Sequence, residues 1–105
     1  MTHQDVMAML KETNLPFAYD HFAEGEAPDP PFLLFLFPAS ENFSADNIAY
    51  VKFKTLHLEL YTEKKDPVLE EQIETILETH ELFWSKSEVY IDSERLYEIL
   101  YTLTV

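Results

Sequence analysis

The stretch Phe32-Leu-Leu-Phe-Leu-Phe37 decides the fold of this chain. It is apolar at every position and lies between Pro31 and Pro38. A short apolar run of this kind, bounded by residues that interrupt regular structure, predicts a β-strand buried on both faces. The rest of the chain must therefore be arranged around a sheet.

Further strands are expected after this run. Ile48–Thr62 is the longest, with apolar residues at odd-numbered positions as far as Phe53 and at even-numbered positions from Leu56 onward. Because side chains alternate with a period of two along a strand, this change of parity needs an extra residue. The sequence therefore predicts a β-bulge near Lys54–Thr55 or, alternatively, two strands that meet at an irregular corner.

The last third of the chain predicts a hairpin. Phe83–Ile91 and Leu96–Val105 both have strand patterns, and the turn Asp92–Glu94 lies between them. In the final strand Tyr97, Ile99, Tyr101, Leu103 and Val105 line one face, and Leu96 and Leu100 lie on the other. A short extended piece is also expected at Phe17–Phe22.

Two helices complete the set of elements. Thr2 followed by Asp5 is typical of a helix start, and the apolar spacing predicts a helix over Thr2–Thr13. Asp66 before Pro67 is a second start, which predicts a helix over Pro67–Leu82. Ala23–Pro31 and Ala39–Asn47 are expected to be loops.

The order α-β-β-β-α-β-β predicts an α+β fold, with a mainly antiparallel sheet of four to five strands and two helices on one face. We expect residues 1–105 to form a single domain. Two helices cover only one side of such a sheet, whereas Phe32–Phe37 and Leu96–Leu100 are apolar on both sides. The surplus indicates a protein–protein contact, with the long strand and the C-terminal strand at or near it.

The charge of the chain limits its partners. Asp and Glu number 20 against 7 Lys and Arg, which gives a net charge of −13 at pH 7. Such a surface repels phosphate, so we expect no specific nucleic-acid binding and no membrane partner. The acidity is compatible with mimicry of a nucleic acid, with tolerance of DNA nearby, or only with solubility. No apolar run approaches a membrane span and no signal peptide is visible, which favours an intracellular location.

No catalytic or metal signature is present in the sequence. The chain contains no cysteine and one glycine, and its serines lack the context of an activated nucleophile. The histidines lie in four separate segments (His3, His21, His57 and His80) without metal-ligand spacing. His80 is expected to be a core or helix-end residue. We therefore expect no enzyme activity, no cofactor and no metal.

A few residues are candidates for contacts between subunits. Phe43 is a lone aromatic in an expected polar loop, which suits an interface anchor or a residue that folds back on its own core. Lys52, Lys54, Lys64 and Lys65 form a basic cluster. They either protect a strand edge or complement the acidic second helix of a neighbouring subunit.

Several stretches resemble a family of small acidic proteins of long-tailed phages and prophages of Gram-positive bacteria. They are Leu15–Phe22, Pro31–Pro38 followed by Asn42-Phe43 and Ala45-Asp46, Leu60–Pro67, and Tyr90–Tyr101. The family is similar to tail-completion or tail-terminator proteins, which assemble as rings at the head–tail junction.

The resemblance implies a structural virion assembly protein rather than an enzyme. Its partners would be further copies of itself in a ring, commonly a hexamer, together with the major tail protein and head-connector proteins. DNA would pass through the ring, and the protein would be found in the host cytoplasm during assembly and then in the virion. The residues that we expect at contacts are Phe43, Asp46, Lys52, Lys54, Tyr97 and Tyr101.

Two alternatives remain open. The first, in the same class, is an adaptor on the head side of the junction. The second is an acidic mimic of DNA that inhibits a host nucleic-acid-binding protein.

Overall fold

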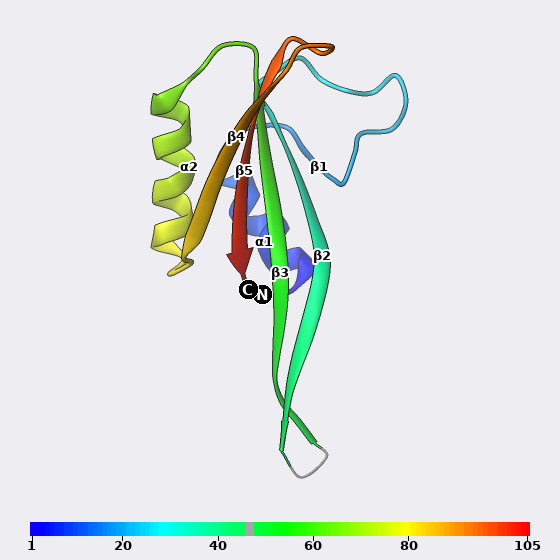
Figure 1. Cartoon of the computed structure of the whole chain (residues 1–105), viewed down its shortest axis with the longest axis vertical. Helices are drawn as coiled ribbons and strands as arrows, with labels where there is room; N and C mark the ends of the chain where they lie inside the picture. Colours follow the sequence, from blue (N-terminus) through cyan, green and yellow to red (C-terminus); the bar gives the residue numbers. More distant parts are fainter. Residues whose placement is uncertain (46–47) are drawn as a thin grey trace.

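The chain folds into two helices and five strands in the predicted order (Figure 1). The structure is a computed structural model that describes residues 1–45 and 48–105, with side chains outside 41–52. Its elements are α1 (His3–Lys11), β1 (Phe17–Tyr19), β2 (Phe32–Ala45), β3 (Ile48–Thr62), α2 (Pro67–Thr79), β4 (Trp84–Ile91) and β5 (Leu96–Thr104). The predicted α+β class is confirmed.

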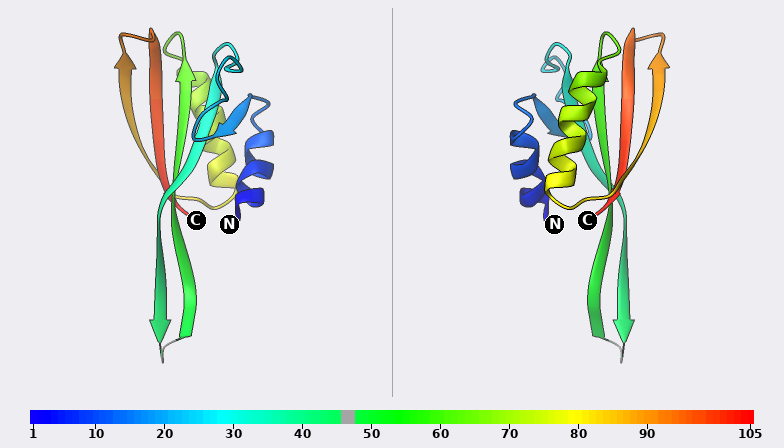
Figure 2. Two further views of the ribbon diagram at one scale, coloured as in Figure 1. Left: turned by 90° about the vertical axis from the view of Figure 1, so that its right-hand side faces the viewer. Right: turned by 90° about the vertical axis from the view of Figure 1, so that its left-hand side faces the viewer.

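The five strands form one sheet in the order β1-β2-β3-β5-β4. The short β1 is parallel to β2, and every other pair is antiparallel. Both helices lie against the same side of the sheet (Figure 2). The mainly antiparallel sheet with two helices on one face is therefore as predicted, and the C-terminal hairpin is formed by β4 and β5.

The helices begin where the sequence predicts. The Thr2 hydroxyl accepts a hydrogen bond from the Asp5 N–H at 3.1 Å, and the Asp5 carboxylate accepts one from the Thr2 N–H at 2.8 Å. This reciprocal arrangement satisfies two donors of the first turn. At the second start the Asp66 carboxylate accepts from the Leu69 N–H at 3.1 Å, with Pro67 at the first helical position.

Both helices end earlier than predicted. Helix α2 stops at Thr79 because Glu81 adopts a left-handed conformation with φ 60°. The Leu82 N–H then bonds to the Leu77 carbonyl and the Glu81 N–H to the Glu78 carbonyl, which closes the helix without a glycine. Helix α1 stops at Lys11, shortly before Asn14, whose φ is also positive. Within the described residues, no helix is long and apolar enough to cross a membrane.

The core lies between the helices and the sheet. Its fully buried members are Val6, Met9, Leu10, Leu33, Phe35, Leu56, Leu58, Leu60, Ile73, Leu77, Ile99, Tyr101 and Leu103. The strand residues in this set alternate along β2, β3 and β5, as expected when a single face of a sheet is buried against helices.

The expected loop at Ala39–Asn47 is wrong as far as the structure describes it. Residues up to Ala45 belong to β2, which pairs with β3 as far as the couple Ala45 and Ile48. Strand pairing overrides the polar composition of the segment because β-propensity is weak compared with a cross-strand partner. The paired residues 39–45 and 48–53, which we call the arm, extend beyond the last β3–β5 pair, Lys54 with Val105 (Figure 1).

The bulge predicted in the long strand is also wrong in its location. β3 runs along β5 without a register shift to Lys54, so it contains neither the bulge nor the corner at Lys54–Thr55. One register shift lies in the partner strand between Leu36 and Ala39, where Pro38 has no N–H to donate to the ladder. A second shift leaves one extra residue in β3 between Ala49 and Val51, within the arm. The apolar positions of β3 change from odd to even numbers because Phe53 is not a core residue. It lies in the arm, beyond the helices, and is 43% exposed.

Candidate assembly surface

The side of the sheet opposite the helices, which we call the open face, carries no third layer of secondary structure among the described residues (Figure 2). It is formed by the strand residues that alternate with the buried ones. Its larger side chains are Phe32, Leu34 and Leu36 of β2, His57, Glu59 and Tyr61 of β3, Val89 and Ile91 of β4, and Leu96, Glu98 and Leu100 of β5; Ser85, Ser87 and Thr102 lie on the same face. The sequence prediction that one face of the sheet is left without helices is confirmed.

The apolar part of the open face is only partly shielded by the chain itself. The Phe22 ring, from the segment before β2, packs against the Phe32 ring with centroids 5.3 Å apart, and Phe32 in turn contacts Tyr61 at 5.1 Å. Leu34 and Leu100 remain half-buried, and Val89 is 54% exposed. Apolar side chains are therefore available for contact over several adjacent strands.

Two carboxylates lie within this apolar surface. The Tyr61 hydroxyl donates to Glu59 Oε1 at 2.9 Å. Partial burial, together with the neighbouring charge of Glu59, raises the pKa of Glu98 above its usual range. Burial and the hydrogen bond to Glu59 likewise raise the pKa of Tyr61. The open face therefore combines apolar side chains with two carboxylates, Glu59 and Glu98, that influence each other's charge.

The structure places the predicted contact tyrosines away from this surface. Tyr101 is fully buried and faces the helices, so its side chain has no surface to offer a partner, and this prediction is wrong. Tyr97 points to the same side of β5 and packs against Tyr90 of β4, with ring centroids 4.9 Å apart. Their parity along the strand fixes this outcome, because the residues that alternate with Leu96 and Leu100 lie on the covered face.

The remaining predicted contact residues lie at or near the arm. Asp46 falls outside the described residues, and so do the side chains of Phe43 and Lys52. The backbone of Phe43 is in β2, paired with Val51, and so it is not in a loop as predicted. Lys54 lies at the base of the arm, where its ammonium group is 5.3 Å from the Phe37 ring centroid and 3.4 Å from the Met1 carbonyl oxygen.

The expected basic cluster does not form among the described side chains. Lys54 contacts the N-terminal residue, whereas Lys65 lies before α2 and pairs with Glu70 at 2.7 Å and with Glu88. Lys65 therefore meets the acidic second helix of its own chain. One of the two predictions was that these lysines complement the acidic second helix of a neighbouring subunit. The pairing of Lys65 with both Glu70 and Glu88 could not be predicted, because it depends on how α2 packs against β4.

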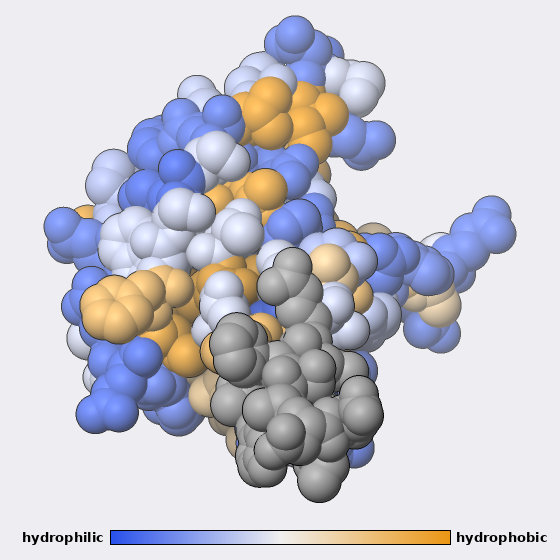
Figure 3. All heavy atoms as spheres, turned by 60° about the horizontal axis from the view of Figure 1, so that its bottom comes forward, coloured by the Kyte–Doolittle hydropathy of each residue, from blue (hydrophilic) through white to orange (hydrophobic). Residues whose placement is uncertain are grey.

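Large hydrophobic side chains are also exposed outside the core. The set comprises Tyr19, Phe53, Val68, Phe83, Val89 and Tyr90. Figure 3 views the molecule from the end that carries the arm and shows orange, hydrophobic atoms at the surface between blue, hydrophilic ones. Phe83, at the connection from α2 to β4, is 95% exposed, the largest fraction of this set.

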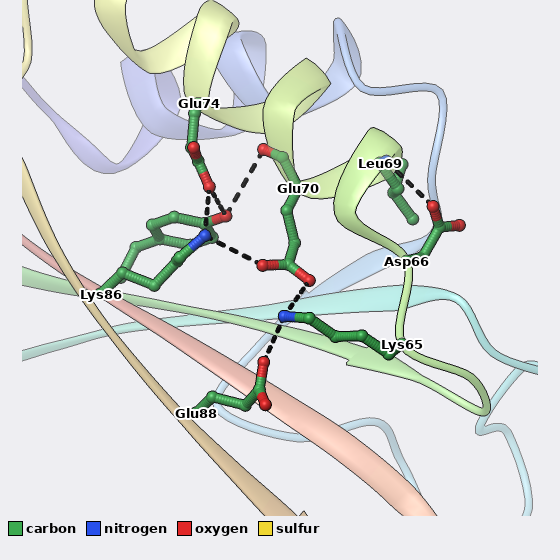
Figure 4. A network of polar contacts seen from close by, with 8 residues as sticks. Lys65, Asp66, Leu69, Glu70, Glu74, Lys86 and Glu88 are labelled. Carbon is green, nitrogen blue, oxygen red and sulfur yellow. Dashed lines mark hydrogen bonds and ion pairs between the residues drawn. The ribbon is translucent and has the colours of Figure 1, made fainter.

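A network of ion pairs fastens α2 to β4 (Figure 4). Glu70, which is only 3% exposed, accepts from Lys65 at 2.7 Å and from Lys86 of β4 at 2.9 Å. Lys86 also donates to Glu74 at 2.9 Å, and Glu74 accepts a hydrogen bond of 2.7 Å from the Tyr101 hydroxyl. These contacts draw the charged side chains of an edge strand inward, which is a known way to protect such an edge.

The electrostatics of the network follow from its pairing. Burial opposes the charge on Glu70, but the hydrogen bonds from Lys65 and Lys86 outweigh it and hold the pKa of this carboxyl below its usual value. The bond to Glu70 raises the pKa of Lys65, and the bond to Glu74 raises that of Lys86. Burial and the bond to Glu74 raise the pKa of Tyr101. The pKa shifts of Glu70, Lys65 and Lys86 therefore favour their charged, salt-bridged forms, and that of Tyr101 favours the neutral phenol.

The histidines are placed separately. His80 is the C-terminal cap of α2, and its Nε2 lies 2.6 Å from Glu12 Oε2 at the end of α1, so the helix-end reading of this residue is confirmed. His3 packs against Tyr19 and Phe35. Among the described residues, no group of three or more His, Cys, Asp or Glu side chains is arranged to hold a metal ion.

No protein-family model matches this chain, and no curated protein matches it significantly. The open face, the arm and the resemblance described above are therefore the features that indicate a function.

Proposed function

We propose that this chain is a structural subunit of the head–tail junction of a long-tailed phage or prophage. Within the junction it would form a tail-completion or terminator ring, which caps the tail tube and joins it to the head connector. One observation carries the proposal: a sheet whose second face is left open, with a two-stranded arm that continues beyond the core (Figure 1). Open apolar sheet surface is typical of proteins that associate.

Features of the chain support this assignment. The arm carries paired backbone beyond the rest of the sheet, and the molecule measures 51 Å along its longest axis against 30 and 23 Å along the others. An arm of this kind suits contacts that reach a neighbouring subunit. The net charge of −13 suits a ring through which DNA slides, because a basic lumen would bind the DNA.

The proposed partners are other copies of this chain, the major tail protein and head-connector proteins. The stretches that carry the resemblance include the β4–β5 turn and the start of α2, which lie at the same end of the molecule, away from the arm (Figure 1). We propose that the two ends of the subunit meet different components of the junction, because they differ so strongly in shape.

The first experiment measures the mass of the chain alone and with the purified major tail protein. We expect an assembly of several chains, at least when the tail protein is present as a template. Val89→Asp places a charge on the open face and should prevent assembly, because Val89 is exposed and its replacement leaves the core intact. Val68→Asp is the matched control, since Val68 is exposed on α2 and away from the open face.

A chain that stays monomeric with the tail protein would contradict the proposal. Assembly of Val89→Asp as efficiently as wild type would contradict the role of the open face.

A second experiment separates the two stations in the junction. Particles made without this protein are viewed by electron microscopy. Overlong or unjoined tails indicate a terminator, whereas normal-length free tails and filled heads that leak indicate a head-side adaptor. Mimicry of DNA is supported less well, because Glu70 and Glu74 of the acidic helix are paired with Lys65 and Lys86 and do not present free charge.

A further inference from the structure

The connection between α2 and β4 carries a surface that the proposed function does not use. Phe83 is 95% exposed, whereas Leu82 and Trp84 on either side of it pack against the core. An aromatic side chain gains nothing from folding when it is left in water, and residues of this type dominate the binding energy of protein interfaces. Phe83 is therefore available to a partner, and the fold does not use its side chain.

The backbone holds Phe83 outward between two fixed points. Before it, the Leu82 N–H bonds to the Leu77 carbonyl at 3.0 Å, which fixes the end of α2. After it, the Trp84 ring lies edge-on to the buried Tyr101, with centroids 5.6 Å apart. Because both neighbours are anchored, little conformational freedom is lost when Phe83 meets a partner.

A hollow of about 800 Å³ lies beside this side chain. It is lined by Glu78, Glu81, Leu82, Phe83 and Trp84. We call it the α2–β4 hollow; the connection between α2 and β4 lies at the end of α2 nearer the arm (Figure 1). Neither Glu78 nor Glu81 forms an ion pair with another described residue. The lining therefore combines apolar surface with two carboxylates that lack a cation.

We propose that the α2–β4 hollow binds a segment of a different protein that presents an apolar side chain flanked by Lys or Arg. The apolar side chain would pack against Phe83 and Trp84, and the cations would meet Glu78 and Glu81. A second copy of this chain is a poor occupant: it carries a net charge of −13, and a symmetric contact at this site would bring four carboxylates together. The inference does not depend on ring formation.

Trp84 is the only tryptophan in the chain, so its fluorescence reports on this hollow alone. The probes are three acetylated and amidated peptides with the same Leu-Phe-Leu centre, flanked on both sides by Lys, by Gln or by Glu. We expect the Lys-flanked peptide to shift the emission saturably and to bind about threefold to tenfold more tightly than the Gln-flanked one, as two exposed ion pairs allow. The preference should decrease as salt is added.

Variants assign the binding to the named residues. Phe83→Ser should weaken binding of the Lys-flanked peptide by about tenfold or more, as expected for the loss of an aromatic anchor. The double variant Glu78→Gln, Glu81→Gln should retain binding and lose the preference for Lys. Val68→Ser, which removes an exposed hydrophobic residue near the other end of α2, should bind as wild type.

Three results would overturn the inference. They are equal binding of the Lys- and Glu-flanked peptides, unchanged binding by Phe83→Ser, and no saturable shift with any peptide up to millimolar concentration. A shift of Trp84 emission with protein concentration alone would assign the hollow to a second copy and would also overturn it. Because Phe83 lies outside the core, an unfolding curve like that of wild type is expected for Phe83→Ser.

Discussion

The covered face and the open face of the sheet are built from the same strands, whose successive side chains point to opposite sides. On the covered face the core residues of β2, β3 and β5 are fully buried and apolar, and the most deeply buried charged group, Glu70, has two lysine partners. On the open face Leu34 and Leu100 are half-buried and surround carboxylates that have no cation among the described residues. The comparison teaches that one face specifies the fold, whereas the other, which the helices leave uncovered, is the face that we propose for contact.

The largest expected effect separates the two faces by stability. Leu58→Ala removes a fully buried side chain of β3 and should lower the free energy of unfolding by about 2–5 kcal/mol, because a cavity is left between the helices and the sheet. Leu100→Ala, on the open face, should lower it by about 1 kcal/mol, since part of that side chain already contacts water. Urea unfolding of both variants is the measurement. Equal losses would show that the open face is as well covered as the other.

The core and the open face could be predicted from residue patterns to different degrees. Thr2 with Asp5 and Asp66 with Pro67 fix the helix starts, and the run Phe32–Phe37 predicts a strand, because each depends on local chemistry. Full burial of that run on both faces is wrong: Leu33 and Phe35 are buried, whereas the other residues of the run are only partly buried. Because two helices can cover only one side of a sheet, the number of helices alone predicts that the other side is left open.

The predictions that are wrong have a shared cause: each depends on which strand or helix lies beside the residue in the folded chain. The arm was expected to be a loop because its composition is polar, and the pairing of residues 39–45 with β3 is a tertiary property. The bulge was assigned to β3, although the irregularity is imposed by Pro38 on the partner strand. Lys86 was missed altogether, because nothing in the sequence indicates that β4 lies beside Glu70 and Glu74.

The next effect concerns the buried carboxylate of the covered side. Glu70→Gln should lower the free energy of unfolding at pH 7 by about 1–3 kcal/mol, toward the lower end because Lys65 and Lys86 are partly exposed and recover water. The pKa of Glu70 is lower in the folded than in the unfolded chain. Its stabilisation is therefore present above the unfolded pKa and is lost as the pH falls through the folded pKa.

The measurement is the free energy of unfolding of wild type and Glu70→Gln from neutral pH to below the usual carboxyl range. We expect the two curves to converge in acid. Glu71→Gln, at the neighbouring exposed position of α2, is the control and should follow wild type at every pH. Parallel curves for wild type and Glu70→Gln would contradict the assigned role of the lysine pair.

The smallest expected effect is an increase in the free energy of unfolding, and it comes from a substitution on the open face. Partial burial and the charge of Glu59 raise the pKa of Glu98, so the folded chain binds this proton more readily than the unfolded chain does. Charged Glu98 therefore opposes folding at neutral pH, and the opposition disappears as the pH falls through the folded pKa toward the unfolded value. Glu98→Gln should raise the free energy of unfolding at pH 7 by less than about 1 kcal/mol, because the group is still reached by solvent.

The difference between wild type and Glu98→Gln should shrink on acidification, with Glu94→Gln in the exposed turn as the control. A Glu98→Gln variant less stable than wild type at pH 7 would contradict the coupling to Glu59.

The same coupling bears on assembly, since a subunit that covers the open face removes water from Glu98 and must supply either a cation or a proton. If the neighbour brings no cation, mild acid should promote association of wild type, and Glu98→Gln should associate equally well at both pH values.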